Sequence, residues 1–396
     1  MEFEYWWLLG FPLFFVLGWV AARIDIRHLV SESRALPRSY FRGLNFLLNE
    51  QPDKAIEAFI EVVKVDPETI ELHFALGGLF RRRGETDRAI RMHRNLLERD
   101  DLTPEQRLNA AFELGQDYLK AGLLDRAEEV LTGLTQSSYR SESLTALLEI
   151  YQQEKDWARA IGIAREMEAE SGKSWQKEIA QYLCELAAHE ATHSRPKEAQ
   201  LHLEQALQAN RRCVRASVQL GDLALAAGDA EAAIGHWKRI EQQNPAFLSL
   251  AARRLLDAHI RLGRGAEGLT MLRGHLASFA SIDLLEVTFQ ATLEAPPADG
   301  GGAEGAYRLV KEELRRNPTL LGLDRLLEAQ IMAAPAERRG DLELVKNLVH
   351  SHTRRLARYR CEQCGFKARQ FFWHCPGCGG WETYPPKRSE EYDPAP

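Results

Sequence analysis

Between residues 36 and 318 the chain repeats one pattern of apolar and polar positions. Amphipathic segments with apolar residues three and four apart alternate with short polar turns, as in GLNFLLNEQPDKAIEAF and GLFRRRGETDRAIRMH. Every second segment has a small residue at an equivalent place, at intervals of 33 to 39 residues: Ala55, Ala89, Ala127, Ala160, Ala199, Ala233, Gly268 and Ala306. The pattern predicts about eight helix-turn-helix repeats.

A period near 34 residues is that of the tetratricopeptide repeat, in which stacked helix pairs bury a continuous core. Small residues on the first helix, such as Gly43 and Gly77, are expected to face the small residue of the second helix. Large residues such as Phe59, Leu131 and Trp237 should then fill the seam to the next repeat. No alternating strand pattern interrupts residues 23–355, so the predicted fold class is all-α, a tetratricopeptide superhelix with a concave surface for protein segments.

The pattern changes after the last repeat. Residues 319–359 are expected to form two C-terminal helices, and the longer helix has an apolar stripe that should dock the following segment against the last repeats: Val345, Leu348, Val349, Leu356 and Tyr359. A glycine-rich insertion at 296–305 lengthens the turn inside the eighth repeat. Residues 385–396 are predicted to be a disordered tail.

An uncharged apolar run covers residues 5–22. Such a run spans about 27 Å as a helix, so residues 1–22 predict a transmembrane anchor and residues 23–35 a linker. A cleaved signal peptide is the alternative, but acidic rather than basic residues precede the run. The arginines all follow it, beginning at Arg23, so the positive-inside rule predicts a single-pass protein with a periplasmic N-terminus and a cytoplasmic bulk.

Four of the six cysteines lie within eighteen positions, as Cys361-x-x-Cys364 and Cys375-x-x-Cys378. Two paired knuckles indicate a tetrahedral site of four cysteines for one metal ion, zinc or iron, in a module over residues 360–384. A redox-exchange role would need one knuckle rather than two. Because all four ligands are protein thiolates, the site offers no open position to a substrate.

Aromatic and basic residues surround the knuckles. The aromatic residues are expected to form the small core of the module: Phe366, Phe371, Phe372, Trp373 and Trp381. Together with the nearby arginines they also invite an RNA-binding interpretation. The formal net charge of −6 gives no global attraction to nucleic acid, so an anionic lipid or an acidic protein partner is favoured over RNA.

Three other features have a structural and a functional interpretation. The sequence HEATH at 189–193 matches the zinc-protease signature, but it ends a helix and lacks a third ligand, so no catalytic residue is expected there. The arginines at 81–83 form either a solvated helix end or a groove for an acidic segment. Cys184 and Cys213 are expected to be buried small apolar residues.

Together these features resemble the lipopolysaccharide assembly protein B family of Gram-negative bacteria. RYRCEQCGF and WHCPGC look like that family's rubredoxin-type module, and GLNFLLNEQPDKAIEAF and LFRRRGETDRAIRMH look like its first repeats. The resemblance covers essentially the whole chain and implies iron as the metal on Cys361, Cys364, Cys375 and Cys378. The chain departs from the family in its glycine-rich residues 299–302.

The resemblance implies a non-enzymatic adaptor of the inner membrane. The family helps the membrane AAA+ protease FtsH to degrade the deacetylase that commits to lipid A synthesis, and it is tied to other lipopolysaccharide synthesis and transport proteins. The expected partners are therefore FtsH, that deacetylase, those proteins, and membrane lipid around the N-terminal helix. A pure envelope-assembly scaffold and an RNA-binding zinc-ribbon protein are the alternatives, and the oligomeric state, a homodimer included, stays open.

Overall fold

The computed structural model describes the following residues: 15–19, 38–49, 51–65, 70–297, 300–353 and 357–390. It divides the chain into two compact units, residues 1–154 and 155–396, with the boundary inside the fourth repeat. Of the predicted anchor and linker only residues 15–19 are described, as helix with exposed apolar side chains, and the other positions lie outside the described residues. Within the described ranges, no helix is long and apolar enough to cross a membrane.

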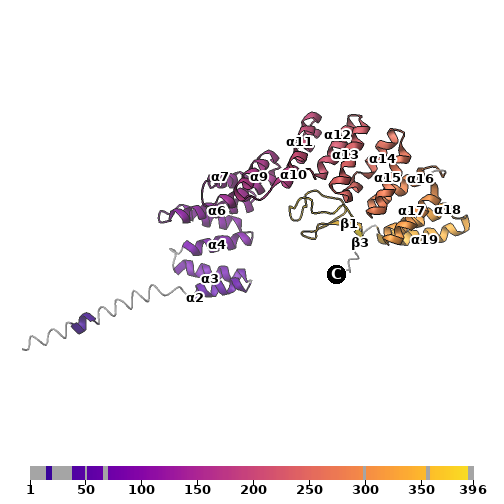
Figure 1. Ribbon diagram of the computed structural model, residues 1–396. Coiled ribbons are helices and arrows are strands. Elements are labelled where there is room, and N and C mark those ends of the chain that lie inside the picture. The colour runs from indigo at the N-terminus through magenta and orange to yellow at the C-terminus, as the bar shows by residue number, and fades with distance from the viewer. Residues whose placement is uncertain are drawn as a thin grey trace, which may run out of the picture. The chain divides into compact units, whose positions relative to one another are not determined.

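The first unit consists of helix pairs joined by short turns (Figure 1). Its helices are α2 (Arg38–Leu48), α3 (Pro52–Val65), α4 (Ile70–Arg82), α5 (Thr86–Leu97), α6 (Pro104–Lys120), α7 (Leu124–Gly133) and α8 (Arg140–Glu154). α2 packs on α3, α4 on α5 and α6 on α7. These pairs are the first three predicted repeats, and α8 is the first helix of the fourth.

The second unit continues the same order of helices. They are α9 (Trp157–Ser171), α10 (Gln176–Thr192), α11 (Pro196–Ala209), α12 (Val214–Ala226), α13 (Ala230–Gln243), the 3₁₀ helix η2 (Pro245–Leu250), α14 (Ala252–Arg261), α15 (Gly265–Ser278), α16 (Ile282–Glu294), α17 (Gly302–Arg316), α18 (Leu320–Ala333) and α19 (Ala336–Thr353). α10 to α17 pack as the fifth to eighth repeats, and α18 and α19 form a last pair. The predicted all-helical repeat body is confirmed.

One backbone position in the turn of the second to seventh repeats has a left-handed conformation. In six successive repeats it lies five residues before the small residue of the second helix: Gly84, Gly122, Lys155, Ser194, Gly228 and Gly263. A side chain in this conformation costs about 1–2 kcal/mol, which explains why glycine occupies four of the six positions. Lys155 and Ser194 adopt it with φ of 59° each.

The glycines of the first helices make room for a large residue of their own repeat, not for the small residue that the sequence pattern suggested. A Cβ built on Gly77 would lie 2.3 Å from His93 Nε2, and one on Gly221 would lie 2.2 Å from Trp237 Nε1. Gly43 and Gly115 are related in the same way to Phe59 and Leu131, again sixteen positions later. The seven small alanines of the second helices have no exposed surface.

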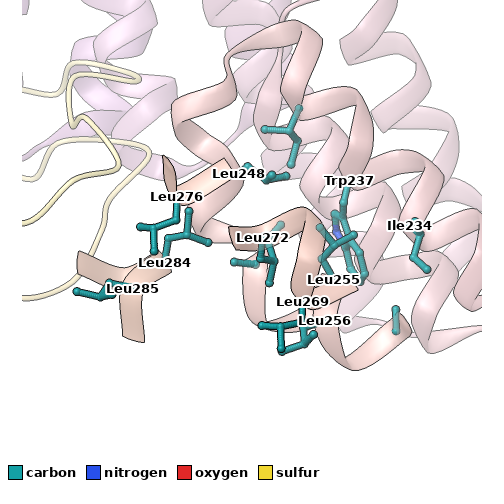
Figure 2. Packing of buried hydrophobic residues seen from close by; sticks show 14 of the residues in the cluster. Ile234, Trp237, Leu248, Leu255, Leu256, Leu269, Leu272, Leu276, Leu284 and Leu285 are labelled. Atoms are coloured by element: carbon teal, nitrogen blue, oxygen red, sulfur yellow. The ribbon is translucent and has the colours of Figure 1, made fainter. Parts of the chain in front are cut away.

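A continuous hydrophobic cluster of the second unit runs from α12 to α18. Figure 2 shows its middle, where Trp237 of α13 lies near leucines of α14 and α15. Trp237 has no exposed surface, and its Nε1 donates a hydrogen bond to the Val218 carbonyl (3.1 Å). Each helix pair therefore shares its apolar face with the next, as a solenoid requires.

The C-terminal segment is a small sheet rather than a helix and a disordered tail. α19 ends at Thr353, whereas the C-terminal helices were expected to extend to residue 359. Strand β1 (Ala357–Arg360) pairs antiparallel with β2 (Lys367–Ala368) and with β3 (Ser389–Glu390). The tail expected over 385–396 thus contributes a strand, and its residues 391–396 lie outside the described chain. Strand pairing between such distant segments leaves no local signal in a composition-based prediction.

The apolar stripe of α19 does not dock this sheet, contrary to the sequence-based expectation. Val345 and Leu348 are 46% and 57% exposed, and Tyr359 lies on β1 rather than on the helix. The contacts that hold the sheet on the repeats come from its own side chains instead.

Candidate metal centre

The structure brings the four cysteines of the knuckles together. Their sulfurs all lie within 4.8 Å of one another, with 3.8 Å between Cys361 and Cys378 and 3.6 Å between Cys364 and Cys375. A tetrahedron with metal–sulfur bonds of about 2.3 Å has edges of about 3.8 Å, so the cluster fits one ion. Of all the His, Cys, Asp and Glu side chains in the described ranges, no other group of three or more is arranged to hold a metal.

The two knuckles are built alike. In the first knuckle the Cys361 N–H donates to the Phe366 carbonyl, and the Gly365 N–H donates to the Cys361 carbonyl (2.9 Å each). In the second, the Cys375 N–H donates to the Gly380 carbonyl, and the Gly379 N–H donates to the Cys375 carbonyl (2.9 Å each). Gly365 and Gly379 have φ of 77° and 68°, so glycine is required where each knuckle reverses.

Hydrogen bonds favour ionisation of two of the four thiols. Burial raises the pKa of Cys361, but the Thr383 hydroxyl and backbone N–H groups outweigh it and lower that pKa to about 6. Burial also raises the pKa of Cys375, and backbone N–H groups again outweigh it. For Cys378 the Gly380 N–H lowers the pKa, but burial and the neighbouring thiols raise it to about 12. Because thiolates this close repel one another, a cation is needed to hold all four ionised, and the donor set fits a metal ion.

Two residues that the sequence analysis missed support the cluster. Thr383 Oγ1 lies 3.2 Å from Cys361 Sγ, within reach to donate to the thiolate. Tyr384 has no exposed surface, and its hydroxyl lies 3.9 Å from Cys375 Sγ and donates to the Phe366 carbonyl (3.2 Å). Tyr359 and Tyr384 form the centre of the small core, against which Phe371 and Phe372 pack. The sequence signal for Thr383 and Tyr384 was their position a few residues after the second knuckle.

An aromatic cluster joins the module to the first helices of the second unit. The Trp381 ring lies 6.0 Å from that of Trp157 and 5.8 Å from that of Tyr182, both edge-on, and His374 stacks on it at 4.3 Å. The Arg215 guanidinium lies 5.8 Å from the same ring. Trp381 was expected in the module's own core, but it packs on the repeats.

Further contacts extend this interface along the unit to the eighth repeat. Trp373 stacks on Phe247 of η2 at 5.7 Å. Gln181 of α10 donates to Glu382 (2.8 Å), and burial raises the pKa of that carboxyl. On α16, Asp283 accepts a hydrogen bond from the Tyr359 hydroxyl (2.6 Å), beside an ion pair with an arginine of the C-terminal segment. Aromatic rings engaged in this way are not available to stack on bases, which weighs against the RNA-binding alternative.

The HEATH sequence lies at the C-terminal end of α10. Glu190 forms an ion pair with Arg195 (2.5 Å), and His193 Nδ1 lies 2.8 Å from the His189 carbonyl. The two imidazoles approach each other, with ring centroids 4.2 Å apart. This arrangement uses the Glu190 carboxylate to close the turn between α10 and α11.

Of the arginines at the end of α4, Arg81 belongs to an internal network, whereas Arg82 and Arg83 are exposed, as at a solvated helix end. Arg81 donates to Asp117 (2.8 Å) and pairs with Glu113 (2.6 Å). Asp117 has no exposed surface, and its second oxygen lies 2.5 Å from His93 Nδ1. Arg83 likewise pairs with acidic side chains. The network joins the second repeat to the third.

Cys184 and Cys213 are buried, as predicted. Their sulfurs lie 3.8 Å apart between α10 and α12, and neither belongs to a disulfide. Burial raises the pKa of Cys184, so its thiol stays protonated in the core, and both side chains pack as small apolar groups.

A repeat body that carries a module with four clustered cysteines defines a tetratricopeptide protein with a rubredoxin-type metal site. Comparison with known proteins agrees. Protein-family models described as tetratricopeptide repeat match residues 42–93 and 184–246, and one described as rubredoxin metal binding domain matches residues 359–386. The chain is 35% identical to lipopolysaccharide assembly protein B of Escherichia coli, over 95% of this chain and 96% of that protein. The chain belongs to the lipopolysaccharide assembly protein B family.

A second relative with lower sequence identity also aligns over nearly its full length. The protein of that name from Haemophilus influenzae is 28% identical over 96% of this chain and 98% of its own length. Among solved structures, a complex of the TPR2AB domain of yeast Sti1 aligns with 70% of this chain and 97% of that chain, with 16% identity and a TM-score of 0.31.

Proposed function

We propose that this protein is a membrane-anchored adaptor in lipopolysaccharide assembly. Family membership over nearly the full length supports the role in lipopolysaccharide assembly. The observation that carries the adaptor part is the docked module, whose side chains contact α9, α10, η2 and α16 and so make one continuous binding body out of repeats and metal site. Such a body is suited to holding protein segments rather than to turning over a substrate.

The metal has a structural role in this proposal. Cys361, Cys364, Cys375 and Cys378 would hold one iron or zinc ion, with iron favoured by the family resemblance. The ion would supply the positive charge that keeps four adjacent thiolates ionised, and so fold the module. The module's own residues then do the docking, through Trp381 and Trp373.

The proposed location is the inner membrane, with the N-terminus in the periplasm and the repeats in the cytoplasm. The apolar run at 5–22 and the arginines that follow it support this topology. In the described part of the run, Phe15, Val16 and Leu17 are 54% to 75% exposed. A lipid environment would bury these side chains.

The partners in this proposal are the membrane protease FtsH and the deacetylase that commits to lipid A synthesis. Confinement of adaptor and protease to one membrane raises their effective concentration, so a weak contact suffices to deliver the substrate. Other lipopolysaccharide synthesis and transport proteins would bind further repeats of the same body, and a homodimer would bring two such bodies together.

The half-life of the deacetylase after translation is blocked tests this proposal. Depletion of the protein should lengthen that half-life and raise the amount of lipopolysaccharide. Deletion of residues 1–22, with the remainder still folded, should have the same effect because the shared membrane is lost. An unchanged half-life after depletion would make a pure assembly scaffold the better assignment, whereas cross-linking to RNA in place of protein would favour the nucleic-acid alternative.

A further inference from the structure

A cavity of about 560 Å³ opens between α14, α15 and α16 in the second unit. Apolar and polar side chains both line it, and two of the apolar ones, Leu256 and Leu269, belong to the cluster in Figure 2. The other apolar side chains in the lining are those of Ile260, Ala266, Ala291, Ala295 and Pro296. Ile260 is 54% exposed, so the cavity is open to solvent on one side. Its volume lies in the range of small-molecule sites, about 300–1,000 Å³.

One positive charge that forms no ion pair with a described side chain lies in this cavity. Arg273 of α15 is half-buried and donates from Nη2 to Thr292 Oγ1 (3.0 Å), while its Nε is buried without a hydrogen-bond partner. Glu294 lines the cavity as well, but no ion pair joins it to Arg273 among the described side chains. A guanidinium that is partly removed from water and lacks a counter-ion is unfavourable unless another group satisfies it.

The glycine-rich insertion forms part of the rim. Its turn is closed by hydrogen bonds from Gly300 N–H to the Pro297 carbonyl and from Gly301 N–H to the Pro296 carbonyl, both 3.1 Å. A Cβ on Gly301 would meet the Ala295 carbonyl oxygen at 2.2 Å, so only glycine allows the turn to fold back against the end of α16. Pro296, the first residue of the insertion, is the part of it that lines the cavity.

We propose that this cavity binds an anionic amphiphile, a molecule with one apolar chain and one carboxylate or phosphate head group. The leucine and alanine side chains would contact the apolar chain of the ligand. The Arg273 guanidinium would donate hydrogen bonds from its Nε edge to the head group. A cavity enclosed by three helices suits a small molecule better than an extended peptide, which needs a groove.

A second pocket of about 360 Å³ provides a built-in control. It is lined by Arg211, Arg212 and Arg239 at the ends of α11 and α13, and Leu207 is its one apolar side chain. An anion attracted by charge alone would bind there, whereas an amphiphile should prefer the cavity around Arg273.

The test uses the full-length protein in native membrane vesicles with a photoreactive dodecanoate that carries a diazirine on its chain. After irradiation, mass spectrometry should place the label on residues 252–296. Excess dodecanoate or dodecyl phosphate should suppress the label, and these two competitors show which head group is preferred. Methyl dodecanoate, which lacks the charge, should not compete. Labelling of the proposed membrane anchor, residues 1–22, is expected from probe dissolved in the bilayer and is not counted. Labelling of the repeats outside residues 252–296, or equal competition by the methyl ester, would overturn the proposal.

Three variants sharpen the assignment. Arg273→Gln should weaken labelling about tenfold, because a charge-assisted hydrogen bond is lost. Ala266→Phe, at an exposed position on the wall, should block the cavity without disturbing the core. Arg239→Gln, in the control pocket, should leave labelling unchanged. Labelling that survives Arg273→Gln and Ala266→Phe, or that falls equally with Arg239→Gln, rules the site out. The readout is independent of deacetylase turnover, so it can fail while the adaptor function holds.

Discussion

The second repeat, in the first unit, and the sixth repeat, in the second unit, are stabilised by different contacts. In the first unit a buried network of charged side chains joins the second repeat to the third, with Arg81 and His93 converging on Asp117. In the second unit the residue equivalent to His93 is Trp237, a large aromatic side chain whose Nε1 donates to the Val218 carbonyl, and a metal module covers several repeats. The same repeat geometry thus accepts either chemistry at its central position.

This difference predicts which change, loss of metal or loss of a buried charge, destabilises each unit. A thiolate–metal cluster couples folding to metal and to reducing conditions, whereas a buried ion network depends on every charge keeping its partner. Removal of metal should therefore affect the second unit alone, and removal of a buried charge in the first unit should leave the module intact.

Metal removal should have the largest effect. Chelation, or Cys361→Ser combined with Cys364→Ser, should unfold the module, because binding energy of about 10 kcal/mol or more in structural metal sites is also folding energy. Hydrogen exchange should then lose protection over residues 357–390 and in the parts of α10 and α16 beneath, while α4 to α6 keep theirs. Elemental analysis should show about one iron or zinc ion per chain before the change and none after it.

Cys184→Ala serves as the control for this experiment, because it removes a buried thiol outside the cluster and should leave the metal content unchanged. A metal-free chain that keeps full protection over residues 357–390 would show that the module folds without its ion.

Asp117→Ala should be the next largest change. Removing one partner from a buried ion pair costs about 3–5 kcal/mol, because Arg81 and His93 are left without their acceptor. Native-state hydrogen exchange in α4 to α6 measures this loss, and the metal content should not change. The matched control is Asp101→Ala, which breaks an ion pair whose carboxylate is 58% exposed and should therefore destabilise the unit much less. Equal effects of the two substitutions would mean that the buried network stabilises the unit no more than an exposed ion pair does.

Part of this contrast was readable in the sequence. The small residues at 33 to 39 residue intervals and the two knuckles are local periodic signals, so they predicted the repeats and the cluster of cysteines. Periodicity does not show which residue a helix face contacts. The partner of Gly77 was therefore predicted wrongly, and neither interpretation of the arginines at 81–83, a solvated helix end or a groove, included the network around Arg81. The docking of Trp381 on α10 joins segments about two hundred residues apart, and only the folded chain reveals it.

A smaller effect should follow at the left-handed turn position that both units share. Ser194→Gly should stabilise the second unit by about 1 kcal/mol, since it removes a side chain from a backbone conformation with φ of 59°. Gly122→Ser in the first unit should destabilise by a similar amount, because a Cβ there meets nothing within 4 Å and only the backbone conformation matters. The midpoint of denaturant unfolding, followed separately by exchange in each unit, measures both. Shifts of the same sign would show that the two turns are not equivalent.

The smallest effect is expected at Glu190, and it tests whether a charge pair near the surface resembles the one buried in the first unit. The Glu190 side chain is 15% exposed, but that of Arg195 is 50% exposed, so water can replace much of what the pair provides. Glu190→Ala should therefore change the free energy of unfolding by no more than about 1 kcal/mol, against the 3–5 kcal/mol expected for Asp117→Ala. Because the carboxylate closes a turn and is assigned no chemical step, the deacetylase half-life should also be unchanged. A longer half-life with unaltered thermal unfolding would mean that the HEATH sequence takes part in the chemistry or in partner binding, since loss of a turn contact alone would first appear as lower stability.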